Sequence, residues 1–378
     1  MTARPQIFPA GTALRERGYR MPAEWEPHAA TWIAWPHNRE DWPGKFQPIP
    51  WVYAEIVRHL ARHEIVEIIV NDAEGERRAR KVLESAGVEL GTVVRFHRWT
   101  TDRVWTRDYG PIFLRKDASP RNWTPRNAPG EGPLLATTWR FNAWAKYPNW
   151  QNDAKVGAKI AASQRIPVTR PTQRLNGKDH RVVLEGGSID VNGRGTLLTT
   201  EECLLSPEQA RNPGISREQL EKTFADYLGI SKVLWLGSGI SGDDTHGHVD
   251  DLARFVSPDT VVAVSERDPA DPNFAALEEN LRRLRAMSDQ DGKALRVVEL
   301  PMPSAVTFQG RRLPASYANF YIANGLVLVP VFNDKNDRVA LNILGELFPD
   351  REVLGIYCGD LIWGFGAIHC MTQQQPAA

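Results

Sequence analysis

The stretch SIDVNGRGTLLTT at residues 188–200 decides the fold class. Its Asn192-Gly193 pair lies between two strand-like runs, which is the strongest short sequence signal for a β-hairpin. The stretch at 216–228 then predicts a helix, because it begins with a Ser-x-x-Gln capping box and carries leucine and phenylalanine along one face. A hairpin followed by an amphipathic helix indicates a mixed α/β protein.

The same succession of strand, hairpin, strand and helix recurs along the chain. Self-similarity at a fixed period is weak, so an internal repeat is a hypothesis. No linker divides the chain, which predicts one compact domain over 1–378 with a surface loop at 116–133, a stretch rich in Pro, Gly, Arg and Asn. The further predicted elements are strands at 30–35 and 66–70, a hairpin at 317–332, and helices at 51–63, from 73 to about 86, from 271 onward and at 338–348.

Composition excludes several classes of function. Hydrophobic residues make up 42% and charged residues 24%, and Lys+Arg and Asp+Glu both number 46. A chain with zero net charge has no general attraction to nucleic acid or to an anionic membrane. The longest apolar stretch is interrupted by Asn, Gly and Pro, so we expect no membrane span. Three cysteines and an N-terminus without an apolar core predict a reduced, cytoplasmic protein.

Cys370 is the first candidate for chemistry, because it ends the glycine-containing segment GFGAIHC at 364–370. Glycines let the backbone turn sharply and approach a ligand closely. The alternative is a buried, inert cysteine in a terminal strand, as most free cysteines are. Cys203 and Cys358 have plainer surroundings, and we expect both to be inert.

A second cluster lies at 242–251, where four carboxylates and two imidazoles occur within ten residues. If 249–255 forms a strand, His248 and Asp250 lie on the same face. One interpretation is a metal-dependent amidohydrolase site built from His246, His248 and Asp250. The other makes His248 a general acid/base beside a cation-binding Asp250. The structural alternative is a charged loop that ends in a hydrogen-bonded turn.

Two shorter segments complete the set. Trp105 to Asp108 predict a strand that ends at a Gly-Pro pair and holds Asp108 toward a pocket, or else an ordinary Arg-Asp surface strand. Glu185 precedes two glycines and can point into a cleft, since little side-chain bulk covers it; an exposed turn is the alternative. A thiol, an imidazole and several carboxylates suit a guanidinium, because two carboxylates hold its nitrogens and leave its central carbon open to a thiolate.

These segments resemble the agmatine deiminase family, within the guanidine-modifying (pentein) superfamily and related to bacterial-type peptidylarginine deiminases. The resemblance covers nearly the whole chain, and its motifs are specific only when taken together. They are MPAEWEPH at 21–28, WTRDYGP at 105–111, WRFNAW at 139–144, LEGGSID at 184–190, LLTTEECLL at 197–205, GHVDDL at 247–252, SYANFYIANG at 316–325 and IHCMTQQQP at 368–376.

The resemblance implies a five-bladed α/β propeller with pseudo-fivefold symmetry and the site at its centre. It implies that Cys370 is the nucleophile and His248 the general acid/base. The family's additional glutamate, which orients the histidine and assists proton transfer, falls on Glu185. No metal and no organic cofactor is implied.

The family's guanidinium-binding carboxylates fall on Asp108 and Asp250, and Trp105 matches the position that lines the path of the substrate. The expected reaction is agmatine plus water giving N-carbamoylputrescine plus ammonia through a covalent thiouronium, in polyamine biosynthesis or agmatine catabolism. The expected partner is therefore a small guanidine, with no nucleic acid and no membrane, and a homodimer is the possible assembly.

Three positions depart from the family pattern. Phe365 stands where a glycine is usual, and Ala367 and His246 each replace an asparagine. They lie beside the site and leave the substrate tail open, so deimination of peptidyl or free arginine is an alternative. More distant alternatives are the amidohydrolase of His246, His248 and Asp250, and a non-catalytic binding protein for cationic amines.

Overall fold

The structure, a computed structural model, describes residues 14–117 and 132–378 as a mixed α/β fold. Within these residues, five sheets of three or four strands share one internal order, in which two antiparallel strands are followed by a strand parallel to the second of them. A helix connects the two parallel strands in every case. The alternation predicted from the sequence is thus confirmed as five structural units.

The strands of the five units are β21 (Gln373–Pro376), β2 (His28–Ala34) and β3 (Ile65–Val70); β5 (Ile112–Lys116), β6 (Leu134–Thr137) and β7 (Val168–Thr169); β10 (Asp190–Val191), β11 (Thr196–Thr200) and β12 (Lys232–Leu236); β13 (Ala253–Ser257), β14 (Thr260–Ser265) and β15 (Arg296–Pro301); and β18 (Tyr321–Ala323), β19 (Leu326–Val331) and β20 (Glu352–Tyr357). The connecting helices are α1 (Ile49–Leu60), α4 (Val156–Ser163), α6 (Arg217–Leu228), α7 (Phe274–Ala286) and α8 (Asp337–Leu347). Other elements are α2 (Ala73–Ser85), β1 (Tyr19–Arg20), β4 (Val94–Arg98), and the hairpins β8 (Thr172–Leu175) with β9 (Lys178–Arg181) and β16 (Thr307–Phe308) with β17 (Arg311–Arg312).

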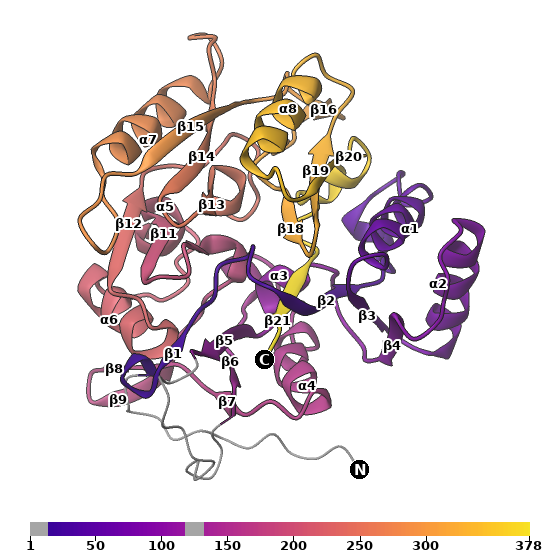
Figure 1. The fold of residues 1–378 in the computed structure, drawn as a ribbon, viewed down its shortest axis with the longest axis horizontal. Coiled ribbons are helices and arrows are strands. Elements are labelled where there is room, and N and C mark those ends of the chain that lie inside the picture. Colours follow the sequence, from indigo (N-terminus) through magenta and orange to yellow (C-terminus); the bar gives the residue numbers. More distant parts are fainter. Residues whose placement is uncertain (1–13, 118–131) are drawn as a thin grey trace.

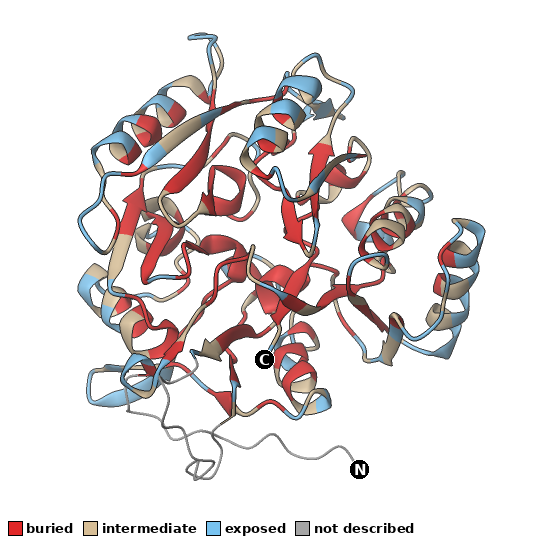
Figure 2. Cartoon of the chain, in the orientation of Figure 1, coloured by how far each residue is buried: buried red, intermediate tan, exposed pale blue. Residues whose placement is uncertain are grey.

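Helices α1, α2, α6, α7 and α8 lie on the outside of the molecule, and most strands lie nearer its middle (Figure 1). Figure 2 shows the consequence for burial: the strands are mostly buried, whereas each outer helix has an exposed face. Helix α1 illustrates the sequence cause, because Tyr53, Ile56 and Leu60 recur on its inward face and are fully buried.

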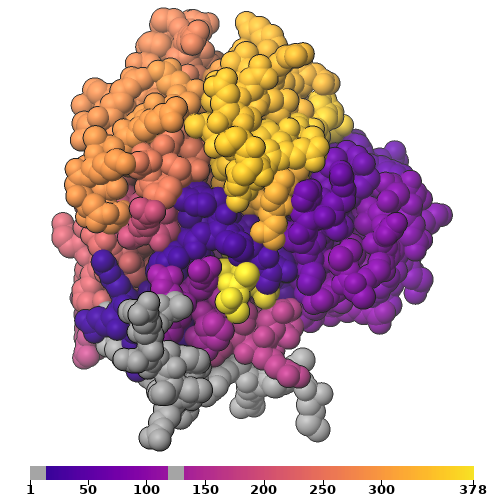
Figure 3. All heavy atoms as spheres, in the orientation of Figure 1, coloured from indigo at the N-terminus to yellow at the C-terminus, as the bar shows by residue number. Residues whose placement is uncertain are grey.

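The C-terminal strand joins the N-terminal sheet. β21 pairs antiparallel with β2, so Gln373 lies opposite Trp32. The indole Nε1 of Trp32 also donates a 3.0 Å hydrogen bond to Gln375, 343 positions later in the chain. Figure 3 shows the result, with yellow C-terminal atoms at the middle of this face surrounded by indigo and magenta segments.

Local signals in the sequence predicted most elements correctly. The capping box is confirmed, since Ser216 accepts from the backbone of Gln219 and the Gln219 side chain accepts from the backbone of Ser216. Both Asn-Gly pairs lie in turns between antiparallel strands. No helix in the described part of the chain is long and apolar enough to cross a membrane. Most of the predicted loop at 116–133 lies outside the described residues.

One predicted strand begins later than expected, and another is wrong. Residues Val249–Asp251 form the 3₁₀-helix η6, and β13 begins only at Ala253. The segment after Trp105 forms the helical turn α3 (Thr106–Tyr109), because the Thr106 hydroxyl donates to the backbone carbonyl of Met371 at 2.6 Å. Such a tertiary contact overrides the alternation of polar and apolar residues.

Candidate active site

Each of the five units carries a polar residue just before the first strand of its antiparallel pair. These segments meet in the interior, where their side chains contact one another. In chain order they supply Asp108 before β5, Glu185 before β10, His248 and Asp250 before β13, Asn319 before β18 and Cys370 before β21. The structure thereby brings five of the six predicted site residues together, and the sixth, Trp105, lines the cavity above them.

Asp108 is buried in the turn α3, and its carboxylate is held from two sides. The indole of Trp144 donates to one oxygen at 2.9 Å, and the backbone N–H of Gly187 donates to the other at 3.1 Å. Burial raises the pKa of Asp108 to about 6, although the charge of His248 acts in the opposite direction. The carboxylate is therefore easily protonated until a cation approaches it.

His248 lies between three carboxylates. Its Nδ1 is 3.9 Å from an oxygen of Asp108 and 3.9 Å from an oxygen of Asp250, and its Nε2 is 3.8 Å from Glu185. Burial opposes an imidazolium, but the charge of Asp108 and the contacts with Cys203 and Glu185 raise the pKa of His248 well above its usual value. The ring is thus positioned as a proton donor.

Glu185 is completely buried and stays ionised. Burial opposes the charge, yet Arg211 and His248 lower the pKa of this carboxyl below its usual value. The Arg211 Nε donates to one oxygen at 3.2 Å, while the other oxygen faces His248 without a hydrogen-bond partner. This arrangement suits a group that orients the imidazole.

Asp250 is tied to a buried chain of charges. His369 bridges it to Glu24, with 2.7 Å from Nδ1 to Asp250 and 2.8 Å from Nε2 to Glu24. Glu24 in turn pairs with Arg254 at 2.9 Å and with Arg107 at 3.2 Å. Burial opposes ionisation, but the contacts with His369 lower the pKa of Asp250. Arg107 is buried here, so the surface-strand alternative for its segment is wrong.

Cys370 lies in the turn before β21 and is only 5% exposed. The side-chain amide of Asn319 donates to its sulfur at 3.1 Å, and an oxygen of Asp250 lies 3.7 Å from the sulfur. Burial raises the pKa of the thiol well above its usual value, and the charges of Asp250, Asp251 and Asp108 add to this effect. A cation bound between these carboxylates would reverse the electrostatic part of the shift.

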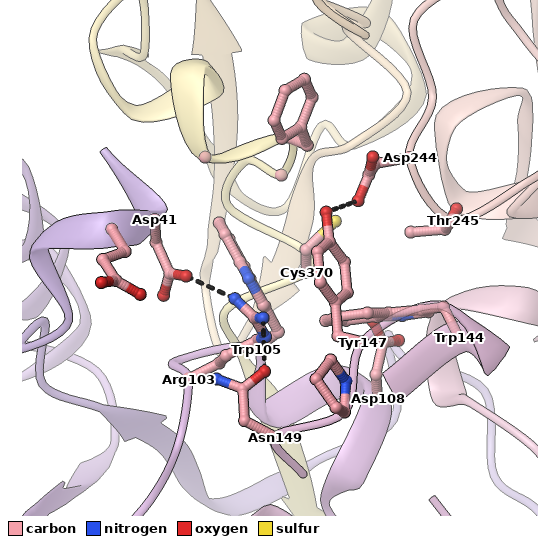
Figure 4. Close-up of a pocket in the computed structure, with 15 residues that line it drawn as sticks. Asp41, Arg103, Trp105, Asp108, Trp144, Tyr147, Asn149, Asp244, Thr245 and Cys370 are labelled. Atoms are coloured by element: carbon pink, nitrogen blue, oxygen red, sulfur yellow. Dashed lines mark hydrogen bonds and ion pairs between the residues drawn. The ribbon is translucent and has the colours of Figure 1, made fainter. Parts of the chain in front are cut away.

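A cavity of about 390 Å³ leads to the thiol (Figure 4). Three predicted residues, Trp105, Asp108 and Cys370, line it, whereas the other predicted residues lie behind its wall. Its remaining lining residues are Glu40, Asp41, Arg103, Trp144, Tyr147, Pro148, Asn149, Asp244, Thr245, Gly364, Phe365 and Gly366.

Two ion pairs stand at the sides of this cavity. Arg103 pairs with Asp41 at 2.5 Å, and Lys146 pairs with Asp244 at 2.6 Å. The hydroxyl of Tyr147 also donates to Asp244 at 2.5 Å, as Figure 4 shows. Asp41 and Asp244 are therefore each matched by a base, whereas the lining acids Glu40 and Asp108 have no ion-pair partner of this kind among the described residues.

Gly187 leaves open the point where the site residues converge. A Cβ at this position would lie 2.6 Å from Nδ1 of His248, 2.9 Å from Asp108 and 3.0 Å from Asp250. Both ring nitrogens of His248 and one oxygen each of Glu185 and Asp250 are buried without a hydrogen-bond partner. A planar cation with several N–H donors is the kind of ligand that satisfies the two unpartnered carboxylate oxygens.

The sequence missed two neighbours of the site. Cys203 was expected to be inert in plain surroundings, but its sulfur and ligand atoms of Glu185 and His248 lie within 4.8 Å of one another. Among the described residues this trio is the group able to hold a metal ion. His246, of the amidohydrolase alternative, instead lies 3.7 Å from Glu202. The second neighbour that the sequence missed is Asn319. It lies just before the first strand of its unit, as the predicted residues do in the other four units.

Phe365 adopts a backbone conformation that normally requires glycine. It follows the 3₁₀-helix η7 (Leu361–Gly364) with φ of 65° and ψ of 20°, in the left-handed region. For a bulky side chain this costs about 1–3 kcal/mol. Ala367, the other departure in this segment, is buried.

Comparison with known proteins agrees with this geometry. The family described as Porphyromonas-type peptidyl-arginine deiminase matches residues 20–376. An agmatine deiminase of Medicago truncatula is 36% identical over 386 residues, spanning 95% of this chain and 97% of the relative. The chain belongs to the agmatine deiminase family. Another member, the agmatine deiminase of Pseudomonas aeruginosa strain LESB58, is 34% identical across 96% of this chain and 97% of its own length.

The fold of the family is shared as well. The solved structure of the agmatine deiminase of Enterococcus faecalis aligns with a TM-score of 0.84 at 31% identity, covering 98% of this chain and 99% of that chain. The region that matches the family, residues 20–376, therefore includes every segment that supplies the site.

Proposed function

We propose that the protein hydrolyses agmatine to N-carbamoylputrescine and ammonia. The observation that carries the proposal is that Cys370 and the buried carboxylate of Asp108 line one cavity, while an oxygen of the buried Asp250 lies 3.7 Å from the Cys370 sulfur. The activity named for the relatives supports agmatine as the substrate.

Asp108 and Asp250 hold the guanidinium by charge-assisted hydrogen bonds to its nitrogens. Binding of this cation offsets the negative charge that raises the pKa of Cys370, so the thiol releases its proton to solvent as the substrate enters. The Asn319 amide, which already donates to the sulfur, stabilises the thiolate. Trp105 forms a wall along which the substrate passes.

The thiolate attacks the central carbon, and a C–S bond forms. His248, held as an imidazolium, gives its proton to one nitrogen, which departs as ammonia while the C–N bond breaks. The product of this step is a cationic S-alkylthiouronium on Cys370. Glu185 keeps the imidazole in position throughout.

The neutral His248 then accepts a proton from water, whose oxygen attacks the same carbon. The C–S bond breaks, Cys370 leaves as a thiolate, and the urea group gives its extra proton to ammonia through solvent. As the product leaves, the thiolate takes back from solvent the proton that it released at the start. The balance is agmatine plus water giving N-carbamoylputrescine plus ammonium. His248 ends as the imidazolium with which it began.

The test is an ammonia-release assay across agmatine, free arginine and arginyl peptides. We expect agmatine to have the highest kcat/KM, because more acids than bases line the cavity as a whole, which disfavours the additional carboxylate on the tail of arginine. A kcat/KM for arginine equal to or higher than that for agmatine would indicate that arginine is the substrate. The proposed deiminase chemistry would then still apply. Binding of agmatine without ammonia release would instead support an amine-binding protein.

The trio of Glu185, Cys203 and His248 favours one other candidate, a metal-dependent hydrolase. Dialysis against a strong chelator tests it. We expect an unchanged rate, since the proposed steps use a thiol and an imidazole. Loss of activity that zinc restores would support the metal-dependent candidate.

The proposal also includes the architecture, the location and the assembly of the protein. The five units of identical strand order support a five-bladed α/β propeller, built as a single domain over 1–378. A cytoplasmic location and a homodimer are proposed with it; fractionation and light scattering test them.

A further inference from the structure

The strained residue Phe365 lines the cavity that Asp108 and Cys370 also line. Its neighbours Gly364 and Gly366 are packed closely against two tryptophans, since a Cβ on them would lie 2.7 Å from Nε1 of Trp42 and 2.6 Å from the ring of Trp105. The backbone therefore turns tightly at these positions. The left-handed conformation occurs at Phe365, which has a side chain, and not at either of the neighbouring glycines.

Contacts on the far side hold the ring of Phe365 in place. The guanidinium of Arg311, on β17, lies 4.5 Å from the ring centroid, and the ring of Trp363 lies 5.9 Å away. The same hairpin is anchored by Phe308, whose ring is 4.7 Å from that of Trp363. Phe365 lines the cavity of Cys370, whereas Phe308 does not.

A bulky side chain persists in the left-handed region only where its surroundings fix it, and such strain is concentrated at ligand sites. We infer that Phe365 determines specificity for the substrate tail. Its ring packs against the unbranched hydrocarbon chain that separates the guanidinium from the distal group. This inference rests on the proposed function, because it concerns the tail of the guanidine substrate.

The other walls of the cavity support this assignment. Trp105, Trp144 and Tyr147 also line it, so a methylene chain that enters is removed from water among aromatic rings. A carboxylate on the carbon next to the distal nitrogen would lose its hydration in the same surroundings. The ring therefore favours agmatine and longer or shorter unbranched homologues over arginine and arginyl peptides.

Two variants distinguish the effect of the aromatic ring from the effect of the backbone strain at Phe365. Phe365→Ala removes the ring but keeps a side chain at the left-handed position, and Phe365→Gly removes both. We expect each to raise the KM of agmatine and of butylguanidine about tenfold, with kcat changed less than threefold. The kcat/KM of arginine should fall less, so that the preference for agmatine over arginine decreases about tenfold. Phe365→Gly should also unfold at a higher temperature than Phe365→Ala.

Phe308→Ala is the matched control, because it deletes an aromatic ring from the same packed group outside the cavity. Its preference for agmatine should equal that of the wild type. Arg311→Ala, an exposed change, should move KM in the same direction as Phe365→Ala by a smaller factor.

Unchanged preference in both Phe365 variants would overturn the inference. It would also be overturned if one variant fails to fold and the other, together with Arg311→Ala, leaves the KM of butylguanidine unchanged. A wild-type protein that releases no ammonia from agmatine would count against the proposed function instead, so the two failures are distinguishable.

Discussion

His369 holds Asp250 through a 2.7 Å hydrogen bond between Nδ1 and a carboxylate oxygen. The opposite ring nitrogen lies 2.8 Å from Glu24, so the imidazole spans two buried carboxylates. The residue preceding the thiol in the chain therefore positions one of the two carboxylates that face the thiol. Asp250 keeps its charge in a fully buried place because of this partner.

Removing this bridge should weaken substrate binding. In His369→Gln one side chain cannot span both carboxylates, so the pKa of Asp250 should rise and KM for agmatine should increase about 10–100-fold, with a smaller change in kcat. Steady-state kinetics across pH measure both. His97→Gln is the control, because His97 forms a similar 2.7 Å contact with Glu67 far from the site. Equal effects of the two changes would contradict the role of His369.

The thiol assignment predicts that Cys370→Ala abolishes turnover while agmatine still binds, since the two carboxylates are retained. Calorimetric titration measures the binding. Cys358→Ala should keep most activity, as Cys358 is buried and outside the cavity. Iodoacetamide should modify Cys370 first, because the other two thiols are completely buried, and agmatine should protect it. An active Cys370→Ala protein would refute the assignment.

The carboxylates that bind the guanidinium should be nearly indispensable. Asp108→Asn and Asp250→Asn each leave a buried cation under-compensated, and we expect each to cost about 3–5 kcal/mol in kcat/KM. The loss should be equal for every guanidine substrate, because it concerns the head group. Asp226→Asn, at an exposed ion pair with Lys222, should leave the rate unchanged. A loss confined to one substrate would mean that the carboxylate contacts the tail.

Asp108 should give both activity and stability a pH dependence. Its pKa of about 6 in the free protein predicts that kcat/KM falls below that pH, as the carboxyl takes up a proton. In the folded state this pKa lies above the ordinary 3.8, so the group favours folding below 3.8 and loses that contribution as pH rises through 6.

Relative to the wild type, Asp108→Asn should therefore be more stable at pH 8 than at pH 3.5. Urea unfolding at the two pH values measures the difference. An equal difference at both values would show that Asp108 is not responsible.

Gly187→Ala should stop catalysis without unfolding the protein. The added methyl would overlap the meeting point of His248, Asp108 and Asp250, and we expect kcat/KM to fall more than a hundredfold. Gly345→Ala is the control, since Gly345 lies within helix α8 with open space around it. That change should raise the free energy of unfolding by about 0.5–1 kcal/mol and leave activity unchanged. Full activity in Gly187→Ala would contradict the described geometry.

The sequence predicted best those elements whose conformation is determined by residues close together in the chain. The capping box at Ser216 and the Asn-Gly turns act over a few positions, so local patterns were sufficient. The turn at Thr106 was predicted as a strand because its cause, a hydrogen bond to the carbonyl of Met371, joins residues 265 positions apart. No pattern within the WTRDYGP segment contains that partner.

The same reason explains the neighbours that were missed. Cys203 reaches His248 because the Thr200 side chain caps helix α5 (Glu201–Leu205) and bonds to the carbonyl of Gly247. Asn319 lies within one of the family motifs, but its significance appears only when the five units are compared. The roles of Cys370, His248, Asp108, Asp250, Glu185 and Trp105 came from the family resemblance, and they stay predictions until the variants are measured.

The pairing of β21 with β2 has a consequence for the proposed chemistry. Cys370 lies three residues before β21, so the thiol is held beside its partners by a strand that pairs with a segment more than 300 positions earlier in the chain. A chain cleaved before residue 370 would keep the carboxylates of Asp108 and Asp250 and lose both the thiol and the strand that pairs with β2. The proposed chemistry and the pairing of the two distant parts of the chain therefore depend on the same short segment.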